Sequence, residues 1–266
     1  MSINPFTEIV NSFTYVDVRP GYPSSLVRTL IDDAGARNDA GGHSTSPLTT
    51  ADIGAGTGKL TQTLVTQASE WQSGSANRSA QVYAIEPSTR MRAGFAQALP
   101  DFPASHLLAT TAENTGLPDA SCDLVTYAQA WHWLDPEATS VEAARIIRPG
   151  GLIAILFNQM DVSVPWVKRL TRIMRSGDVH RAHQPPQLGP EFTEPVLTQT
   201  SYIQHLTPAQ VLELGTTRSS WIRSTPENRA RMRANLEWYV FEQLGYRPEN
   251  FVEIPYLVYC WIARRR

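Results

Sequence analysis

The stretch that decides the fold is Ala51-Asp52-Ile53-Gly54-Ala55-Gly56-Thr57-Gly58-Lys59-Leu60. It leaves a β-rich run, turns through three glycines, and continues into a segment whose apolar residues recur at helical spacing. The glycines let the backbone turn tightly and approach a ligand, and the start of the helix offers free amides and the positive end of its dipole. The stretch therefore predicts a strand–turn–helix unit that holds a cofactor.

Two common phosphate-binding loops do not fit this turn. A nucleotide-binding P-loop needs G-x-x-x-x-G-K-[ST], but Ile53 stands where its first glycine belongs and Leu60 replaces the hydroxyl residue. A dinucleotide fingerprint, G-x-G-x-x-G, would need a third glycine where the chain has Lys59. What remains is D-x-G-x-G-x-G, in which Asp52 and the glycines surround a smaller cofactor with an amino-acid tail.

An acidic residue closes the second predicted strand, which reads Val82-Tyr83-Ala84-Ile85-Glu86 and is ended by Pro87. Glu86 follows Gly58 by 86 − 58 = 28 residues, more than the roughly 20 that are usual in such units. The polar segment 69–80 accounts for the excess as an enlarged surface loop. A carboxylate at this position can accept hydrogen bonds from both hydroxyls of a ribose, and the glycine turn beside it favours that role over a solvated surface acid.

Strands and helices alternate along the first 158 residues, which predicts an α/β protein with a parallel sheet. We expect strands at 49–53, 81–86, 106–111, 123–128 and 151–157, with helices near 58–69, 88–98 and 136–147. An N-terminal arm comes first, followed by a helix from Ser24 to a stop at Gly35 and a polar loop over 35–48. After Asn158 the pattern is less regular, with a strand at 198–204, helices near 207–216 and 226–244, and a final strand at 251–263.

Composition is that of a soluble globular protein: 266 residues, 42% hydrophobic and 18% charged. The longest clean apolar run, 152–157, is far shorter than the ~20 residues of a transmembrane helix. The first 18 residues carry no Lys or Arg, so no secretory signal is visible. Two cysteines imply no disulfide framework, and we expect a cytoplasmic protein without stable membrane insertion.

Charge is divided unevenly along the chain. The net charge of −2 argues against a general nucleic-acid binder, whose affinity depends on neutralising phosphates. Residues 1–158 have 9 basic and 15 acidic side chains (9 − 15 = −6), whereas 159–266 have 14 and 10 (14 − 10 = +4). Nearly all the cations are arginine, which reflects either genome composition or a C-terminal region that faces an anionic substrate.

Further segments resemble the class I S-adenosylmethionine-dependent methyltransferases of the type 11 group, over roughly residues 12–160. The resemblance lies in Thr111-Ala112-Glu113, in 117–125, and in the Pro149-Gly150-Gly151 turn. The segments 15–23 and Ala130-Trp131-His132-Trp133-Leu134-Asp135 are similar to the subgroup that contains trans-aconitate methyltransferases.

This resemblance implies one Rossmann-like methyltransferase domain over 1–266. Its mostly parallel seven-stranded sheet would end in an antiparallel strand and carry helices on both faces. Within it we expect an arm, helix and loop over 1–48, a cofactor-binding core over 49–158, and a substrate-facing region over 159–266.

The resemblance also implies a site for S-adenosyl-L-methionine. We expect its cofactor contacts to come from Tyr15, Arg19, Asp52, Gly54, Ala55, Gly56, Gly58, Glu86, Pro87, Met91, Ala112, Glu113 and Gln129. His132 is the candidate catalytic residue, either as a general base or as a substrate contact, with a packed histidine as the alternative. Trp131, Trp133 and Trp166 are candidate substrate contacts. No metal is expected, because His180 and His183 match no ligand spacing and are predicted to lie at the surface.

The predicted reaction is methyl transfer to a small molecule, with O-methylation of a carboxylic acid or hydroxyl favoured. C-methylation of a quinone or lipid-like ring is an alternative that requires an apolar pocket of Trp166, Phe192 and Tyr202. A cofactor-binding module without turnover is another. An acidic substrate would require a pocket arginine, taken from Arg19, Arg169, Arg172, Arg218 and Arg223. Arg229, Arg231 and Arg233 are predicted to form a solvated helix face, and the protein to be a monomer or homodimer.

Overall fold

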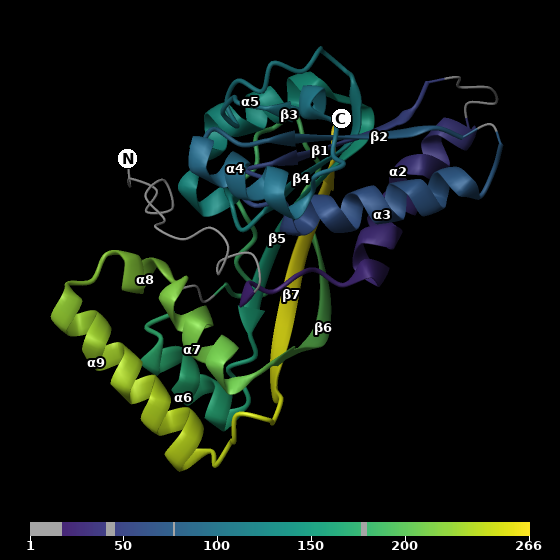
Figure 1. Ribbon diagram of the computed structural model, residues 1–266. Helices are drawn as coiled ribbons and strands as arrows, with labels where there is room; N and C mark the ends of the chain where they lie inside the picture. The colour runs from purple at the N-terminus through teal and green to yellow at the C-terminus, as the bar shows by residue number, and fades with distance from the viewer. Residues whose placement is uncertain (1–17, 41–45, 77, 177–179) are drawn as a thin grey trace.

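The computed structural model describes residues 18–40, 46–76, 78–176 and 180–266 (Figure 1). Its strands are β1 (Leu48–Ile53), β2 (Ala80–Ile85), β3 (Leu107–Leu108), β4 (Cys122–Ala128), β5 (Ile147–Met160), β6 (Val196–Leu206) and β7 (Val252–Arg264). They form one sheet in the order β3-β2-β1-β4-β5-β7-β6. β1 to β5 run parallel, and β7 is antiparallel to both β5 and β6. This is the Rossmann-like methyltransferase fold, and the expected antiparallel last strand is confirmed.

Helices cover both faces of the sheet because side chains alternate between the faces along each strand. In β5, Ile153, Ile155 and Phe157 pack on one face, in a core that also holds α5 (Pro136–Ile146). The intervening residues 152, 154 and 156 pack on the other, against α2 (Ser24–Ala40) and α3 (Lys59–Ser73). α4 (Thr89–Ala98) packs through Phe95 beside β2.

A smaller group of helices packs on the long ends of the last three strands (Figure 1). It comprises α6 (Pro165–Ile173), α7 (Pro208–Thr216), α8 (Ser219–Ile222), α9 (Pro226–Glu237) and a π-helical turn, Trp238–Gln243. Their core joins Met160 at the end of β5 to Leu170 and Leu236 on α6 and α9. This helical lobe (α6 to α9 with the π-helical turn) faces the carboxyl ends of the parallel strands, where α/β folds bind ligands.

Several predicted boundaries are corrected by the structure. α2 does not stop at Gly35 but runs to Ala40, so the predicted loop over 35–48 is helical in its first part. Gly35 is a packing residue: a Cβ there would lie 2.4 Å from Nε1 of Trp71 on α3. The strand expected at 106–111 is only Leu107–Leu108. α6 and α8 were not predicted, and the helix expected over 226–244 becomes π-helical after Glu237.

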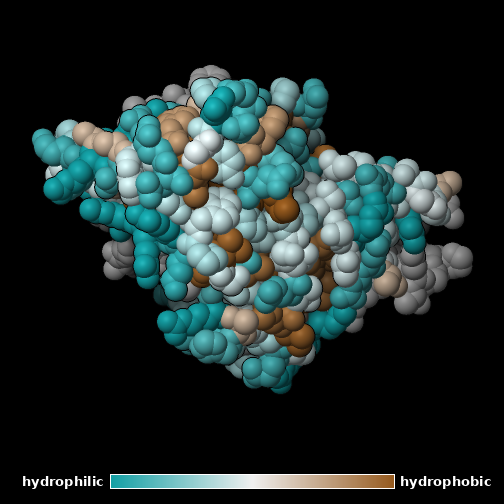
Figure 2. Space-filling model, turned by 90° about the horizontal axis from the view of Figure 1, so that it is seen from below, coloured by the Kyte–Doolittle hydropathy of each residue, from teal (hydrophilic) through white to brown (hydrophobic). Residues whose placement is uncertain are grey.

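The surface seen from below Figure 1 is hydrophilic over most of its area, with apolar residues in small separate patches (Figure 2). In the described parts of the chain no helix is long and apolar enough to cross a membrane.

Candidate functional site

A cavity of about 340 Å³ opens at the carboxyl ends of β1, β2, β4 and β5. It is lined by Arg19, Pro20, Tyr22, Asp52, Gly54–Thr57, Lys59, Leu60, Glu86–Ser88, Met91, Thr111–Glu113, Ala128–Ala130, His132–Leu134, Asn158, Arg218 and Ser219. β2 and β5 are three strand spacings apart in the sheet order, or about 14 Å at roughly 4.8 Å a spacing. The cavity therefore has two ends, one at β1 and β2 and the other at β4 and β5.

The glycine turn between β1 and α3 forms the floor of the first end. Gly54, Gly56 and Gly58 all have positive φ, at 71°, 59° and 85°, a conformation that other residues rarely adopt. A Cβ at Gly54 would lie 2.7 Å from that of Ala130, whereas one at Gly56 would meet no protein atom within 4 Å. The turn thus brings bare backbone to the cavity, with the N-terminus of α3 behind it.

Asp52 is buried beneath this turn and is only 1% exposed. Its Oδ2 accepts a hydrogen bond from Thr61 Oγ1 at 2.6 Å and its Oδ1 accepts one from Thr126 Oγ1 at 3.1 Å. Burial raises the pKa of Asp52 to about 6, against the lowering effect of these two bonds. Asp52 therefore joins β1, α3 and β4 beneath the cavity.

Glu86 closes the same end from β2. Its Oε2 accepts from Gly56 N at 2.9 Å and its Oε1 from Ser88 N at 2.8 Å, so the carboxylate is fixed between the two turns. Burial raises its pKa, while these two backbone bonds act in the opposite direction. A carboxylate has about four acceptor positions, so roughly two remain for hydroxyl groups in the cavity.

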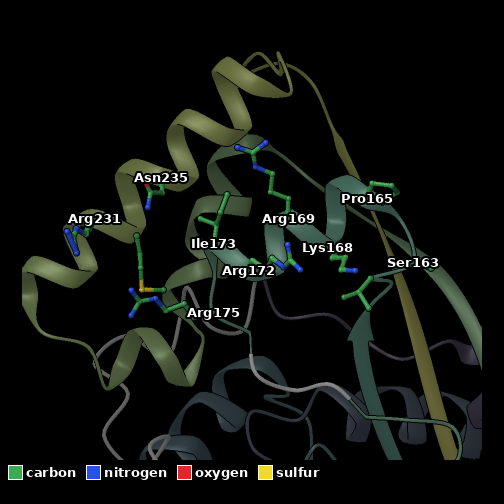
Figure 3. A pocket seen from close by; sticks show the side chains of 11 residues that line it. Ser163, Pro165, Lys168, Arg169, Arg172, Ile173, Arg175, Arg231 and Asn235 are labelled. Carbon is green, nitrogen blue, oxygen red and sulfur yellow. The ribbon is translucent and has the colours of Figure 1, made fainter.

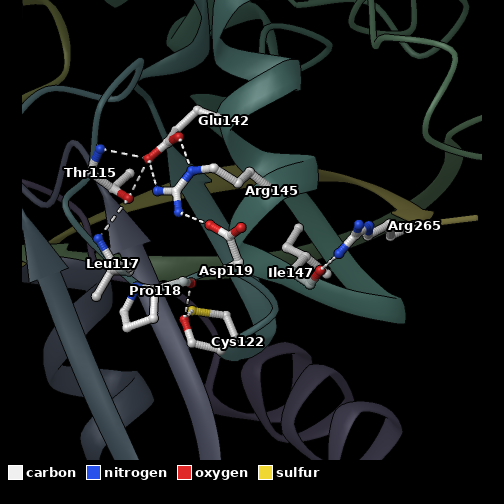
Figure 4. A network of polar contacts seen from close by, with 10 residues as sticks. Thr115, Leu117, Pro118, Asp119, Cys122, Glu142, Arg145, Ile147 and Arg265 are labelled. Atoms are coloured by element: carbon white, nitrogen blue, oxygen red, sulfur yellow. Dashed lines mark hydrogen bonds and ion pairs between the residues drawn. The ribbon is translucent and has the colours of Figure 1, made fainter.

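A network beneath the neighbouring loop holds Ala112 and Glu113 at the cavity wall (Figure 4). Glu142 Oε1, on α5, accepts from Thr115 N at 2.7 Å and from Thr115 Oγ1 at 2.6 Å. Arg145 donates to both oxygens of Glu142, each at 2.8 Å. Burial would raise the pKa of Glu142, but the bonds from Arg145 and Thr115 outweigh it and hold the pKa below its ordinary value.

The second end is closed by a strap of chain, residues 18–23, that precedes α2. Asn158 Nδ2 donates to Gly21 O at 2.7 Å and to Tyr202 Oη at 2.8 Å, and that hydroxyl donates to Gly21 O at 3.0 Å. Arg19 donates to the carbonyl oxygen of Thr217. These bonds place Arg19, Pro20 and Tyr22 against the cavity.

Asn158 and Arg218 at this end were not predicted as cofactor contacts, although Arg218 was one of the candidate pocket arginines. Asn158 is 5% exposed, and its Oδ1 accepts no hydrogen bond from the described residues. The signal that could have identified it is a polar residue at the carboxyl end of an otherwise apolar strand. Arg218 is 7% exposed. Burial raises the pKa of Tyr256, and the charges of Arg218 and Arg19 act against that rise, which places both guanidiniums near one phenol.

His132 lies on a 3₁₀ turn, Trp131–Trp133, that follows β4. Its ring is 4.7 Å from that of Trp133 and 5.7 Å from that of His180. His180 was expected at the surface, but it is half-buried and stacks on Phe157 at 3.7 Å. The structure thus brings a second imidazole beside His132.

Most of the predicted cofactor contacts line the cavity: Arg19, Asp52, Gly54, Ala55, Gly56, Glu86, Pro87, Met91, Ala112, Glu113 and Gln129. Gly58 lies within the turn but packs on Phe95 and Leu99. Gln129, at φ 56°, donates to the carbonyl oxygen of Asn158. Tyr15 lies outside the described residues.

Not every predicted substrate contact reaches the cavity. Trp133 lines it, but Trp131 is buried against Tyr127, and Trp166 packs in the helical lobe. The two tryptophans differ because positions i and i+2 of a 3₁₀ turn point in different directions. Among the candidate arginines, Arg19 and Arg218 line the cavity and Arg223 lies 5.8 Å from the Trp133 ring. Arg169 and Arg172 lie in a separate groove.

Comparison with known proteins agrees with this geometry. Residues 51–155 match the methyltransferase domain family. The uncharacterized methyltransferase Rv3342 of Mycobacterium tuberculosis is 32% identical over 243 residues, which cover 91% of this chain and 88% of the relative. The chain belongs to the methyltransferase family. The uncharacterized methyltransferase C25B8.09 of Schizosaccharomyces pombe is 25% identical over 204 residues, 71% of this chain and 68% of the relative.

A solved structure from Anaeromyxobacter dehalogenans, assigned as a type II methyltransferase, has a similar fold. It is 21% identical, with a TM-score of 0.58, over 93% of this chain and 97% of that one.

The methyltransferase uses S-adenosylmethionine, which when bound supplies a methyl group on a sulfonium. The first end of the cavity fits that cofactor. The glycine turn gives open backbone at Gly56, and the buried carboxylate of Glu86 has acceptor positions left for hydroxyls. In the portions of the chain that are described, no cluster of three or more His, Cys, Asp or Glu could hold a metal ion.

Proposed function

We propose that this methyltransferase O-methylates a small carboxylic acid, which binds at the second end of the cavity. The observation that carries the proposal is that two guanidiniums, of Arg19 and Arg218, line that end beside Asn158. The acidic lining residues are Asp52 near the end of β1, Glu86 directly after β2 and Glu113 after β3. The acids thus lie at the first end, together with Lys59, and the two guanidiniums lie at the second.

A guanidinium suits a carboxylate because its fork of N–H donors can bind both oxygens. Binding of both oxygens fixes the acceptor oxygen in line with the methyl group. Such alignment of the reacting atoms can supply a large part of the rate acceleration of a displacement reaction. Trp133 forms part of the wall at this end.

A carboxylate acceptor is already ionised and needs no general base, whereas a hydroxyl acceptor does. His132 lines the cavity and is the residue we assign to that role if the acceptor is a hydroxyl. Its neighbour His180 is 5.7 Å away between ring centroids.

C-methylation of a ring is the second candidate that the sequence left open, and its expected apolar pocket has little support. Phe192 is buried in the sheet core, Trp166 packs in the helical lobe, and Tyr202 is hydrogen-bonded to Asn158 and Gly21. None of the three lines the cavity.

The test is release of S-adenosylhomocysteine from a panel of mono- and dicarboxylic acids, phenols and quinols. We expect turnover of an acid, and a higher KM for it in Arg218→Lys, because a point charge does not reproduce the guanidinium fork. Arg90→Lys, at an exposed position on α4, is the matched control. His132→Ala should be mild for an acid and severe for a hydroxyl acceptor. Turnover confined to neutral phenols or quinols would overturn the proposal.

A further inference from the structure

A second hollow, the basic groove, lies between α6 and α9 in the helical lobe, away from the glycine turn (Figure 3). It has a volume of about 1030 Å³ and contains five cationic side chains: Lys168, Arg169, Arg172, Arg175 and Arg231. The described lining residues include no acid; the others are Val162, Ser163, Pro165, Ile173, Met232 and Asn235. In Figure 3 Arg231 comes from α9, whereas Lys168, Arg169 and Arg172 come from α6 and Arg175 from the chain after it.

Other arginines on α9 have structural partners. Arg229 donates to the carbonyl oxygens of Trp221 and Ile222, and Arg233 pairs with Glu213 and Glu237. The predicted solvated face is therefore wrong for Arg229, whereas Arg233 is paired but remains 38% exposed. Arg231 lies between them in sequence, is exposed, and lines the groove.

Lys168 and Arg172 are four residues apart on α6 and share one stripe of that helix, and Arg175 follows just after the helix ends. Like charges at this spacing destabilise a helix. Arg175 also adopts φ 48°, a left-handed conformation that costs energy for a residue with a side chain. Arg169 is held beside Trp238 and Tyr239, at 5.2 Å from each ring. A bound anion would offset the repulsion along this stripe.

A narrow hollow lies between the groove and the reaction cavity. It is lined by Asn158, Gln159, Met160, Val162, Thr171, Ser176 and Arg218. Two of these residues, Asn158 and Arg218, also line the cavity, and Val162 also lines the groove. Its volume of about 20 Å³ exceeds only slightly the roughly 10–15 Å³ that one water needs. An acceptor that spans the groove and the cavity must therefore be unbranched at this point.

We propose that the basic groove binds a phosphate-bearing group at the far end of the methyl acceptor, which reaches the cavity by an unbranched chain. This inference rests on the proposed function, because it places the acceptor's reacting end beside Asn158 and Arg218. Several guanidiniums that line one groove suit a group with more than one phosphate oxygen to bind. A concave groove between helices also favours a small ligand over a flat membrane surface or a DNA duplex.

Calorimetric titration with tripolyphosphate tests the groove directly, with saturating S-adenosylhomocysteine present so that the cofactor end is filled. Low salt is needed because exposed charges are screened over about 10 Å at 0.1 M ionic strength. The variant is Arg172→Glu with Arg231→Glu. Its matched control, Arg90→Glu with Arg247→Glu, makes the same change of net charge at exposed arginines outside the groove.

We expect the groove variant to lose at least tenfold in tripolyphosphate affinity and the control less than twofold, with S-adenosylhomocysteine binding equal in both. Equal loss in the two variants, no tripolyphosphate binding, or binding of anionic vesicles or duplex DNA without tripolyphosphate would overturn the proposal. Failure of cofactor binding or of turnover would instead count against the proposed function. The tripolyphosphate titration could still be interpreted in that case, because it measures binding in the groove alone.

A second measurement tests the link to the acceptor. A series of carboxylic acids with a terminal phosphate, of increasing chain length, should show a minimum in KM at one length, and the groove variant should abolish that minimum. The same acids without phosphate should show no difference between variants. A KM that is independent of the phosphate would refute the link.

Discussion

Replacing Glu86 with Gln tests the cofactor end of the cavity most sharply. The Glu86 carboxylate accepts from Gly56 N at 2.9 Å and from Ser88 N at 2.8 Å, and it is 7% exposed. An amide has one acceptor oxygen, so its NH₂ group would face one of these backbone N–H groups. The substitution therefore weakens the fixed geometry and removes acceptor positions that we assign to the ribose hydroxyls.

The expected magnitude follows from the number of bonds lost. A hydrogen bond to a charged group contributes about 1.5–3 kcal/mol, and Glu86→Gln retains one of two acceptor atoms. Loss of one such bond corresponds to roughly a 10- to 100-fold weaker affinity, at about 1.4 kcal/mol per tenfold change.

The assay compares S-adenosylhomocysteine with its 2′,3′-dideoxy analogue by calorimetry in both proteins. The native protein should bind the analogue much more weakly, whereas Glu86→Gln should discriminate far less between the two. Asp101→Asn, which removes an exposed carboxylate outside the cavity, serves as the control. If the two proteins discriminate equally between the ligands while Glu86→Gln remains folded, Glu86 does not bind the ribose.

Three predictions concern stability, each measured by urea unfolding. Burial raises the pKa of Asp52 from 3.8 to about 6, so the folded protein holds this proton more tightly than the unfolded chain does. The contribution of Asp52 to the free energy of unfolding therefore falls as the pH rises from about 4 to 6. Asp52→Asn should remove that dependence and stabilise the protein at pH 7 by up to about 3 kcal/mol, at about 1.36 kcal/mol per pKa unit; an unchanged pH profile would refute this. Glu142→Ala should cost about 1–3 kcal/mol because it leaves the buried N–H and hydroxyl of Thr115 without their acceptor. Asp119→Ala, on the exposed side of Arg145, should cost less than about 1 kcal/mol. Gly35→Ala should cost about 1–3 kcal/mol by overpacking against Trp71, and should be neutral or better in a Trp71→Leu background.

The first end of the cavity could be predicted because each of its two parts lies in one short stretch of sequence. The turn after β1 and the acid at the end of β2 are local signals, and neighbouring parallel strands bring them together. Gly56 and Glu86, 30 residues apart, are joined by one hydrogen bond as this reasoning requires. The strands could also be predicted, because each is a short β-rich run that is recognisable from its own residues. Side chains then alternate between the two faces of the sheet along β5 and β7.

The rest could not be predicted because it depends on contacts between distant segments. Gly35 has the composition of a helix stop, and only the position of Trp71 on α3 shows that it is a packing residue. α6 has only nine residues, of which the first is Pro165, so its apolar residues give too short a periodic signal to predict a helix. Trp131 and Trp133 are equivalent in sequence, and the direction of one 3₁₀ turn decides which of them faces the cavity.

The second end of the cavity is built almost entirely from such distant contacts, and Asn158 is where they meet. Its side chain donates to Gly21, 137 residues away, and to Tyr202 on β6, 44 residues away, while its backbone oxygen accepts from Gln129 after β4. A change on the edge strand β6 can therefore move the strap and the cavity wall together without touching the glycine turn or Glu86. Among the residues described, Asn158, Gly21 and Tyr202 form one hydrogen-bonded cluster, and Glu86 is held separately by Gly56 and Ser88. This separation allows acceptor preference to change while cofactor binding is kept, although Thr126 and Asp52 link β4 to β1 beneath the cavity.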